Sequence, residues 1–173
     1  MVEASVVPEP RLLWPQSVAE FDALIEATQH RLVGFAYCRL HSLADAEDVV
    51  QDVYVQAFRD RARHRNIEDV VPFLFRMVAN RATDLLRKRN RQAKLPAGTG
   101  SAAPGNGYEQ QMEGLLDRLP ARQAAVIRLR IYGELSFDAV ARSVGCSVPT
   151  VKSRFRYGIQ KLRRTLERER GTQ

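Results

Sequence analysis

Apolar residues recur at helical spacing over most of this chain. Behind a capping box that starts at Ser17 and ends at Glu20, they return every three or four positions as far as about Leu40. Similar stretches follow the N-cap residue Ser42 and a break between His64 and Val71. Three amphipathic helices are therefore predicted, which is enough to close a small core. Their inner positions are Phe21, Leu24, Ile25, Leu32, Phe35, Ala36, Val49, Val50, Val53, Ala57, Phe58, Phe73, Leu74, Met77, Val78, Leu85 and Leu86.

The C-terminal third shows the same period in shorter stretches. A helix is predicted around Gln110 to Leu119, and another restarts at Pro120 and halts at Gly133. No stretch has the strict alternation that predicts a β-strand. We therefore expect an all-α fold.

Residues 136–164 predict two helices joined by a tight turn. Ser136 is a good N-cap for the first helix, and Gly145 stands where the reversing chain needs a residue that tolerates positive φ. Ser147 caps the second helix, and no Asp or Glu occurs from 150 through 166, so its outward face is cationic. This is the helix-turn-helix arrangement, whose second helix enters the major groove of DNA. A basic helix face alone is more often a solvated surface, but the caps and the turn favour DNA binding here.

Composition changes along the chain and predicts two domains. Residues 92–107 are rich in Gly, Ala, Pro and Ser and show no periodicity, which is typical of a linker. Residues 1–16 contain several prolines and the only tryptophan, Trp14, and are interpreted as a flexible lead-in. The predicted organisation is a lead-in at 1–16, a helical domain at 17–91, a linker at 92–107, a helix-turn-helix domain at 108–168 and a tail at 169–173.

The overall composition favours a globular protein. Apolar residues make up 45% and charged residues 27%, and no apolar run approaches the ~20 residues of a membrane-spanning helix. The N-terminus lacks the apolar core of a signal peptide, and Cys38 and Cys146 form no CxxC motif, so we expect a cytoplasmic protein without membrane insertion. The net charge of +7 suits a polyanionic partner.

The charge is segregated along the chain. An acidic patch lies within residues 45–52, and a basic patch lies within residues 76–94, opposed only by Asp84. With the basic helix of residues 147–168, the chain has one acidic and two basic surfaces, so partners of both kinds are expected.

Four motifs in this order resemble the extracytoplasmic-function group of the sigma-70 family, the small specificity subunits of bacterial RNA polymerase. They are DAEDVVQDVYVQAF at 45–58, FLFRMVANRATDLLRKRNR at 73–91, LPARQAAVIRLR at 119–130 and TVKSRFRYGIQKLR at 150–163. The resemblance runs from about Phe21 to Leu166, interrupted by the linker. It implies a non-enzymatic factor, without cofactor or metal, whose partners are core polymerase at its clamp and flap regions, promoter DNA and an anti-sigma protein.

The resemblance also implies roles for individual residues. The acidic helix would dock on core polymerase through Asp45, Glu47, Asp48, Gln51, Asp52 and Val55. The minus-ten promoter element would be gripped and opened by Arg61, Arg63, Arg65, Asn66, Arg76, Asn80, Arg81, Asp84, Arg87 and Arg89. The minus-thirty-five element would be contacted by Ser147, Thr150, Lys152, Ser153, Arg154, Arg156, Tyr157, Lys161 and Arg163.

Two positions depart from the family pattern. Phe73 stands where Trp is common, and its place in the helical stripe predicts a core residue rather than a base-stacking one. Gly158 stands where Ala is usual and is expected to lower local helix stability by ~1 kcal/mol.

Two other functions fit parts of the sequence. The first is a helix-turn-helix repressor or activator with an N-terminal dimerisation or effector domain, which would need neither the acidic helix nor a second basic surface. The second is an enzyme. His30, His41 and His64 lack metal-site spacing, the two cysteines resemble small buried hydrophobes, and no phosphate-binding loop appears. The sequence thus favours a polymerase specificity factor.

Overall fold

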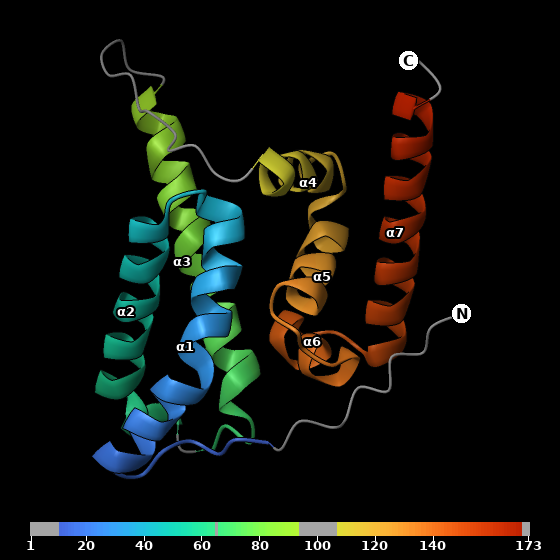
Figure 1. Ribbon diagram of the computed structural model, residues 1–173. Helices are drawn as coiled ribbons and strands as arrows, with labels where there is room; N and C mark the ends of the chain where they lie inside the picture. The colour runs from blue at the N-terminus through green and yellow to red at the C-terminus, as the bar shows by residue number, and fades with distance from the viewer. Residues whose placement is uncertain (1–10, 65, 94–106, 171–173) are drawn as a thin grey trace.

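The computed structural model describes residues 11–64, 66–93 and 107–170, and every regular element in these ranges is a helix (Figure 1). This confirms the all-α prediction. The elements are α1 (Val18–Leu40), α2 (Leu43–Arg59), the short 3-10 helix η1 (Arg61–His64), α3 (Val70–Ala93), α4 (Gly107–Asp117), α5 (Ala121–Ile131), α6 (Phe137–Val144) and α7 (Val148–Arg170).

The helix ends follow the capping residues that the sequence indicated. The hydroxyls of Ser17, Ser42 and Ser136 each accept a hydrogen bond from the backbone N–H three residues later, at 3.2, 3.3 and 3.1 Å. Gly145 ends α6 in the left-handed conformation, with φ of 66°. Because each signal lies next to the end it caps, these boundaries were readable from the local sequence.

Some boundaries differ from the prediction. Helix α3 continues to Ala93 and α4 begins at Gly107, so both ends of the predicted linker are helical. Helix α7 continues through Arg170, into the predicted tail. The rest of the linker, at 94–106, and of the tail, at 171–173, lies outside the described residues.

Helices α1, α2 and α3 form the first half of the molecule, and α4 to α7 form the second (Figure 1). The first half buries one stripe of each helix, including Leu32, Val50 and Leu74. The second half has a smaller cluster in which Leu116, Ile127 and Leu162 join α4, α5 and α7. Each fully buried aliphatic side chain contributes about 1.5–3 kcal/mol relative to an exposed one.

The two halves pack against each other, which the sequence did not predict. Val126, Leu129 and Val140 of the second half belong to the same hydrophobic cluster as the core of the first half. The Arg142 guanidinium of α6 pairs with the buried Asp69 carboxylate at 2.6 Å. The main chain also comes close, because a Cβ at Gly133 would lie 2.9 Å from Phe75 Cε1 of α3. The contact therefore combines apolar burial, an ion pair and a close approach.

The predicted flexible lead-in is wrong for residues 11–16. The Trp14 side chain is only 3% exposed, and its ring centroid lies 5.1 Å from that of His64 and 5.6 Å from that of Phe73. Burial of a large aromatic side chain holds the segment in place, and composition alone does not show where that side chain is buried. Residues 1–10 lie outside the described residues.

Phe73, the two cysteines and the hydropathy of the helices can also be compared with the sequence predictions. Phe73 packs against the core cluster, as its place in the helical stripe predicted. Cys38 is buried and Cys146 partly buried, and neither forms a disulfide bond within the described residues. Within the described ranges, no helix is both long enough and apolar enough to cross a membrane.

Candidate nucleic-acid interface

The predicted polymerase-docking residues share the outward face of α2. Ser42 caps this helix, and Asp45 stands in its first turn, where a carboxylate interacts favourably with the helix dipole. Glu47, Asp48, Gln51 and Asp52 are exposed, and Val55 is 48% exposed beside them. The structure thus brings five of the six predicted residues to one acidic, solvent-facing surface, with Asp45 at its half-buried edge.

Two residues of this surface pair with α3. The Asp52 carboxylate accepts a hydrogen bond from Arg81 at 2.6 Å, and Asp45 accepts one from Arg89. Asp45, Asp52 and Arg81 line a groove of about 410 Å³ between α2 and α3. Hydrogen bonds from Arg89 and then from Ser42 lower the pKa of Asp45 below its usual range. Two surfaces that the sequence treated separately therefore meet in this groove.

Glu47 and Asp48 differ from these paired carboxylates. Both side chains are exposed, and neither forms an ion pair with a residue in the described part of the chain. An exposed and unpaired carboxylate is available to a cationic partner without breaking an internal contact.

The turn between α2 and α3 carries the next predicted residues. Arg61, Arg63 and Asn66 are exposed, and Arg65 lies outside the described residues. The Arg61 guanidinium lies 4.4 Å from the Phe58 ring centroid and donates to the Phe58 carbonyl at 3.0 Å. The turn therefore exposes arginine side chains, and one of them, Arg61, stacks on the Phe58 ring.

The predicted DNA-binding residues of α3 do not form one surface. Arg81 and Asp84 line the groove beside α2, and Arg89 reaches Asp45 of α2. In contrast, Arg76 and Asn80 line a second hollow of about 470 Å³ between the two halves. Asp84 and Arg87 are exposed and lie 3.8 Å apart. Basic residues that follow one another along a helix point to more than one of its faces, and the sequence alone did not show which residues of α3 share a face.

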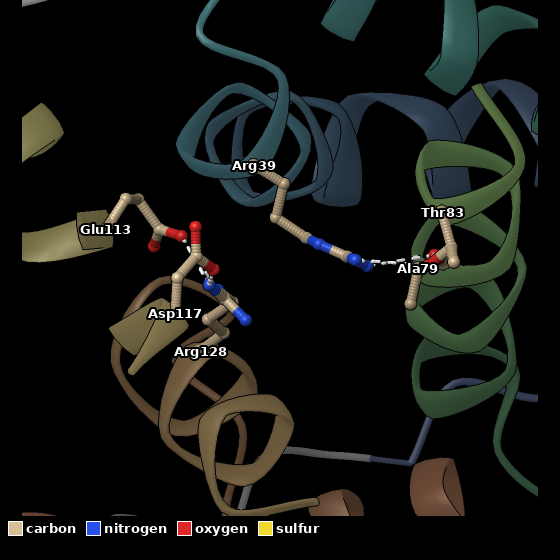
Figure 2. A network of polar contacts seen from close by, with 6 residues as sticks. All are labelled: Arg39, Ala79, Thr83, Glu113, Asp117 and Arg128. Atoms are coloured by element: carbon tan, nitrogen blue, oxygen red, sulfur yellow. Dashed lines mark hydrogen bonds and ion pairs between the residues drawn. The ribbon is translucent and has the colours of Figure 1, made fainter. Parts of the chain in front are cut away.

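Sequence reasoning missed a polar network at this second hollow. Figure 2 shows Arg39 of α1 directed toward α3, where it donates to the Ala79 carbonyl at 2.9 Å and the Thr83 hydroxyl at 3.1 Å. Opposite it, Arg128 of α5 holds the carboxylates of Glu113 and Asp117, each at 2.7 Å (Figure 2).

Burial governs the charges in this network. It raises the pKa of Glu113, although the hydrogen bonds from Arg128 oppose the rise. Burial also lowers the pKa of Arg39, and the nearby positive charge of Arg128 adds to this effect. The hollow beside Arg76 and Asn80 is therefore cationic and partly dehydrated. No local pattern marks these residues, because their partners lie on other helices.

The helix-turn-helix forms as predicted. The Ser147 hydroxyl accepts a hydrogen bond from the Thr150 N–H at 3.4 Å. Val151, on the inner side of the second helix, α7, is fully buried. Phe155 packs edge-on against Phe137 of α6, with ring centroids 5.4 Å apart. These apolar contacts fix the rotation of α7 and so decide which side chains face outward.

The exposed and half-buried faces of α7 divide the predicted residues. Arg154 turns back and donates to Cys146 Sγ at 3.4 Å, so it is half-buried with Thr150 and Ser153. Arg156 and Arg163 line one shallow groove, two helical turns apart. The exposed members of the predicted set are Ser147, Lys152, Arg156, Tyr157, Lys161 and Arg163.

Comparison with known proteins gives matches over both halves. Residues 24–92 match the family described as Sigma-70 region 2, and residues 115–164 match Sigma-70, region 4. The chain is 27% identical over 159 residues to the ECF RNA polymerase sigma factor SigK of Mycolicibacterium vanbaalenii, covering 84% of this chain and 81% of that one. It is 28% identical over 155 residues to the RNA polymerase sigma factor CarQ of Myxococcus xanthus, covering 84% and 88%.

Solved structures show the same arrangement of helices. CnrH in complex with the cytosolic domain of CnrY aligns with a TM-score of 0.69 and 25% identity, over 88% of this chain and 90% of that one. The sigma factor RpoE in complex with the anti-sigma factor NepR from Bartonella quintana aligns with a TM-score of 0.66 and 23% identity, over 87% and 98%. The fold therefore corresponds to that of these proteins over most of its length.

Proposed function

Because the chain belongs to the extracytoplasmic-function group of the sigma-70 family, we propose that it directs core RNA polymerase to specific promoters and helps to open the DNA there. The observation that carries this proposal is the presence of both sigma-70 regions, in the family's order, on one chain. A repressor or activator is not favoured, since such a regulator needs no region 2. The family consists of initiation factors, so the polymerase supplies the catalysis.

The acidic face of α2 is the proposed dock for core polymerase. Its support is the exposure of Glu47 and Asp48, which form no ion pair with the described residues, and of Val55, an apolar side chain beside them. A rim of unpaired carboxylates steers a cationic partner and adds little cost of desolvation. Asp45 and Asp52 would contribute through the pairs that they form with α3.

Two DNA contacts are proposed. The outward face of α7 would contact the minus-thirty-five element in the major groove, because its exposed side chains are basic or hydrogen-bonding. The turn between α2 and α3, with Arg76, Asn80 and the other basic residues of α3, would hold the minus-ten element. Arginine side chains there can bind the phosphates of an opened strand, and the Phe58 ring holds Arg61 in position.

An anti-sigma protein is the proposed regulator. Its support is the likeness to CnrH and to RpoE, each of which was solved with a partner protein, CnrY and the anti-sigma factor NepR. Such a partner would hold the factor away from polymerase until a signal releases it.

In vitro transcription tests the proposed function. Purified bacterial core polymerase, with and without this chain, is given a DNA library randomised at the minus-ten and minus-thirty-five positions, and the transcripts are sequenced. We expect transcripts that depend on the chain and start downstream of a defined pair of sequence elements. Transcription that is identical without the chain overturns the proposal.

A charge reversal locates the dock. The double variant Glu47→Arg, Asp48→Arg should abolish binding to core polymerase, because both residues are exposed and form no ion pair that the described part of the chain would lose. The matched control is Asp22→Arg, Glu26→Arg, which reverses two exposed carboxylates on α1. Normal binding by the α2 variant assigns the dock to another surface.

A further inference from the structure

The segment 11–16 crosses the turn that joins α2 to α3, and both of its ends are fixed. At one end, the Gln16 N–H donates to Glu20 Oε2 at 2.7 Å, which ties the segment to the cap of α1. At the other end, the Leu12 carbonyl accepts from the Val70 N–H at 2.8 Å. Val70 is the first residue of α3, so its N–H has no acceptor within the helix. The segment therefore serves as a backbone cap for α3; we name residues 11–16 the strap.

The centre of the strap is Trp14, which completes a cluster of three rings. Its indole lies against His64 of η1 and Phe73 of α3, and those two rings lie 4.7 Å apart. The three rings come from three separate segments, and the indole is almost fully buried between them. Removal of the indole would leave His64, and with it the turn, packed on one side only.

The turn that the strap holds has little support of its own. Its internal backbone bonds include Arg63 N–H to the Asp60 carbonyl at 2.8 Å and Ile67 N–H to the His64 carbonyl at 3.0 Å. Arg61, Arg63 and Asn66 are exposed on it, whereas Ile67 packs against the core cluster. A turn of this kind makes selective contacts only if its backbone is held before the ligand arrives.

We propose that the strap positions the turn between α2 and α3 for recognition of the minus-ten element, and that Trp14 is its positioning residue. Trp14 is buried and does not itself touch DNA; it acts through His64 and Phe73 on Arg61, Arg63 and Asn66. This inference rests on the proposed function, in which the turn contacts the opened minus-ten strand. It gives residues 11–16 a part in base selection, although they precede both sigma-70 regions in the sequence.

The test compares base preferences on the randomised promoter library, with holoenzymes made from the full chain. Trp14→Ala should reduce the preference at the minus-ten positions by at least about fivefold, the lower end of what loss of one base contact produces. The preference at the minus-thirty-five positions should stay as in wild type. Trp14→Phe should restore most of the minus-ten preference, because a phenyl ring keeps the contact with His64 and Phe73. Leu13→Ala is the matched control, since Leu13 is 73% exposed on the same segment.

The outcomes separate the strap from the general function. Promoter-dependent transcription by wild type, with unchanged minus-ten preference in Trp14→Ala, overturns the role of the strap. Failure of wild type to transcribe overturns the proposed function instead. An equal loss of preference at both elements means that Trp14 acts only on stability, which also overturns the positioning role.

A second variant keeps the test usable if Trp14→Ala does not fold. His64→Ala removes the neighbouring ring and keeps the only tryptophan, whose fluorescence then reports on the strap. We expect Trp14 to be quenched more strongly by acrylamide in this variant and the minus-ten preference to fall selectively. A selective fall supports the strap as the positioning element, and an unchanged preference with an exposed Trp14 overturns it.

Discussion

Asp45 stabilises the packing of two helices and also contributes to the acidic surface of α2. Its backbone N–H donates to the cap Ser42, while its carboxylate accepts from Arg89 of α3. The side chain is 24% exposed, so it lies at the edge of the acidic face rather than on it. Its charge therefore joins α2 to α3 and also adds to the negative potential beside Asp48.

The pKa of Asp45 gives the first prediction. The folded chain binds a proton at Asp45 less readily than the unfolded chain, because the hydrogen bonds from Arg89 and Ser42 lower its pKa. The stabilisation is therefore present above the unfolded Asp pKa of about 3.9 and is lost as the pH falls through the lowered folded value. The size of the effect is about 0.2–1 kcal/mol, as for other partly exposed pairs.

NMR titration of the Asp45 carboxyl measures this shift. In Arg89→Ala the midpoint should rise toward the usual range of an aspartate. Arg87→Ala is the control, because Arg87 is an exposed arginine of the same helix that faces Asp84 instead. The same midpoint in both variants would show that Arg89 is not the cause.

Among the helices, α7 has a position that depends on its close packing against α5. Gly158 is buried in this contact, and a Cβ there would lie 2.6 Å from Ile127 Cδ1. The sequence indicated only the cost of a glycine within a helix. The structure adds its reason, since the glycine lets the two helices pack closely and thereby sets the position of the proposed DNA-binding face.

The second prediction follows from this contact. Gly158→Ala should leave the free energy of unfolding unchanged or lower it, because the gain in helix propensity of ~1 kcal/mol is offset by displacement of Ile127. In an Ile127→Val background, which lacks the Cδ1 atom, the same substitution should be stabilising. Urea unfolding of the four proteins of this double-mutant cycle measures the coupling. Equal effects of Gly158→Ala in both backgrounds would contradict the assigned contact.

The third prediction concerns the division of roles along α7. Arg156 lies in the early turns of α7, which we propose enter the major groove, so Arg156→Ala should cost ~1–3 kcal/mol and relax the preference at one or two minus-thirty-five positions. Arg163 lies two turns later, and Arg163→Ala should weaken binding to all sequences and reduce the salt slope by about one. Binding to single-base promoter variants at several salt concentrations measures both effects. A uniform loss for Arg156→Ala would move base contact to Ser147, Thr150 or Ser153, or to DNA shape.

The helices and their caps could be predicted from the sequence because their causes are local. A serine three residues before its N–H partner, or a glycine at a helix end, is visible within a few positions. The burial of Trp14 and the pairing of Arg81 with Asp52 have no such signal, since each depends on residues far along the chain. The candidate site was therefore predicted as a set of residues, while its division over different faces of α3 was not.

At the scale of the whole molecule, the packing of the two halves was beyond the sequence for the same reason. It depends on Gly133 lying against Phe75, on Arg31 donating to the Gly133 carbonyl at 2.7 Å and on Arg142 reaching Asp69. Two domains with a linker between them were predicted, and nothing in the linker indicates whether they touch. The packing matters for function, because Arg76 and Asn80 line the hollow between the halves.

We expect promoter binding by both halves to require a different arrangement. In the proposed function the two halves contact two separate promoter elements, and one turn of DNA is about 34–36 Å long. In the described arrangement the two halves are in direct contact through one shared hydrophobic cluster. We therefore expect the described arrangement to be the closed state of a molecule whose halves separate on the promoter.

The final prediction tests this closed state through Arg142. Arg142→Ala leaves the Asp69 carboxylate, whose side chain is 8% exposed, without its cation. The loss should disfavour the closed state by about 1–3 kcal/mol, the usual penalty for an unsatisfied buried polar group. Small-angle X-ray scattering should then show a larger radius of gyration, with the helical content unchanged by circular dichroism. Arg122→Ala is the matched control, because Arg122 is an exposed arginine of the same half and forms no ion pair with the described residues. Scattering curves that coincide for both variants and wild type would show that the Asp69 pair does not hold the halves together.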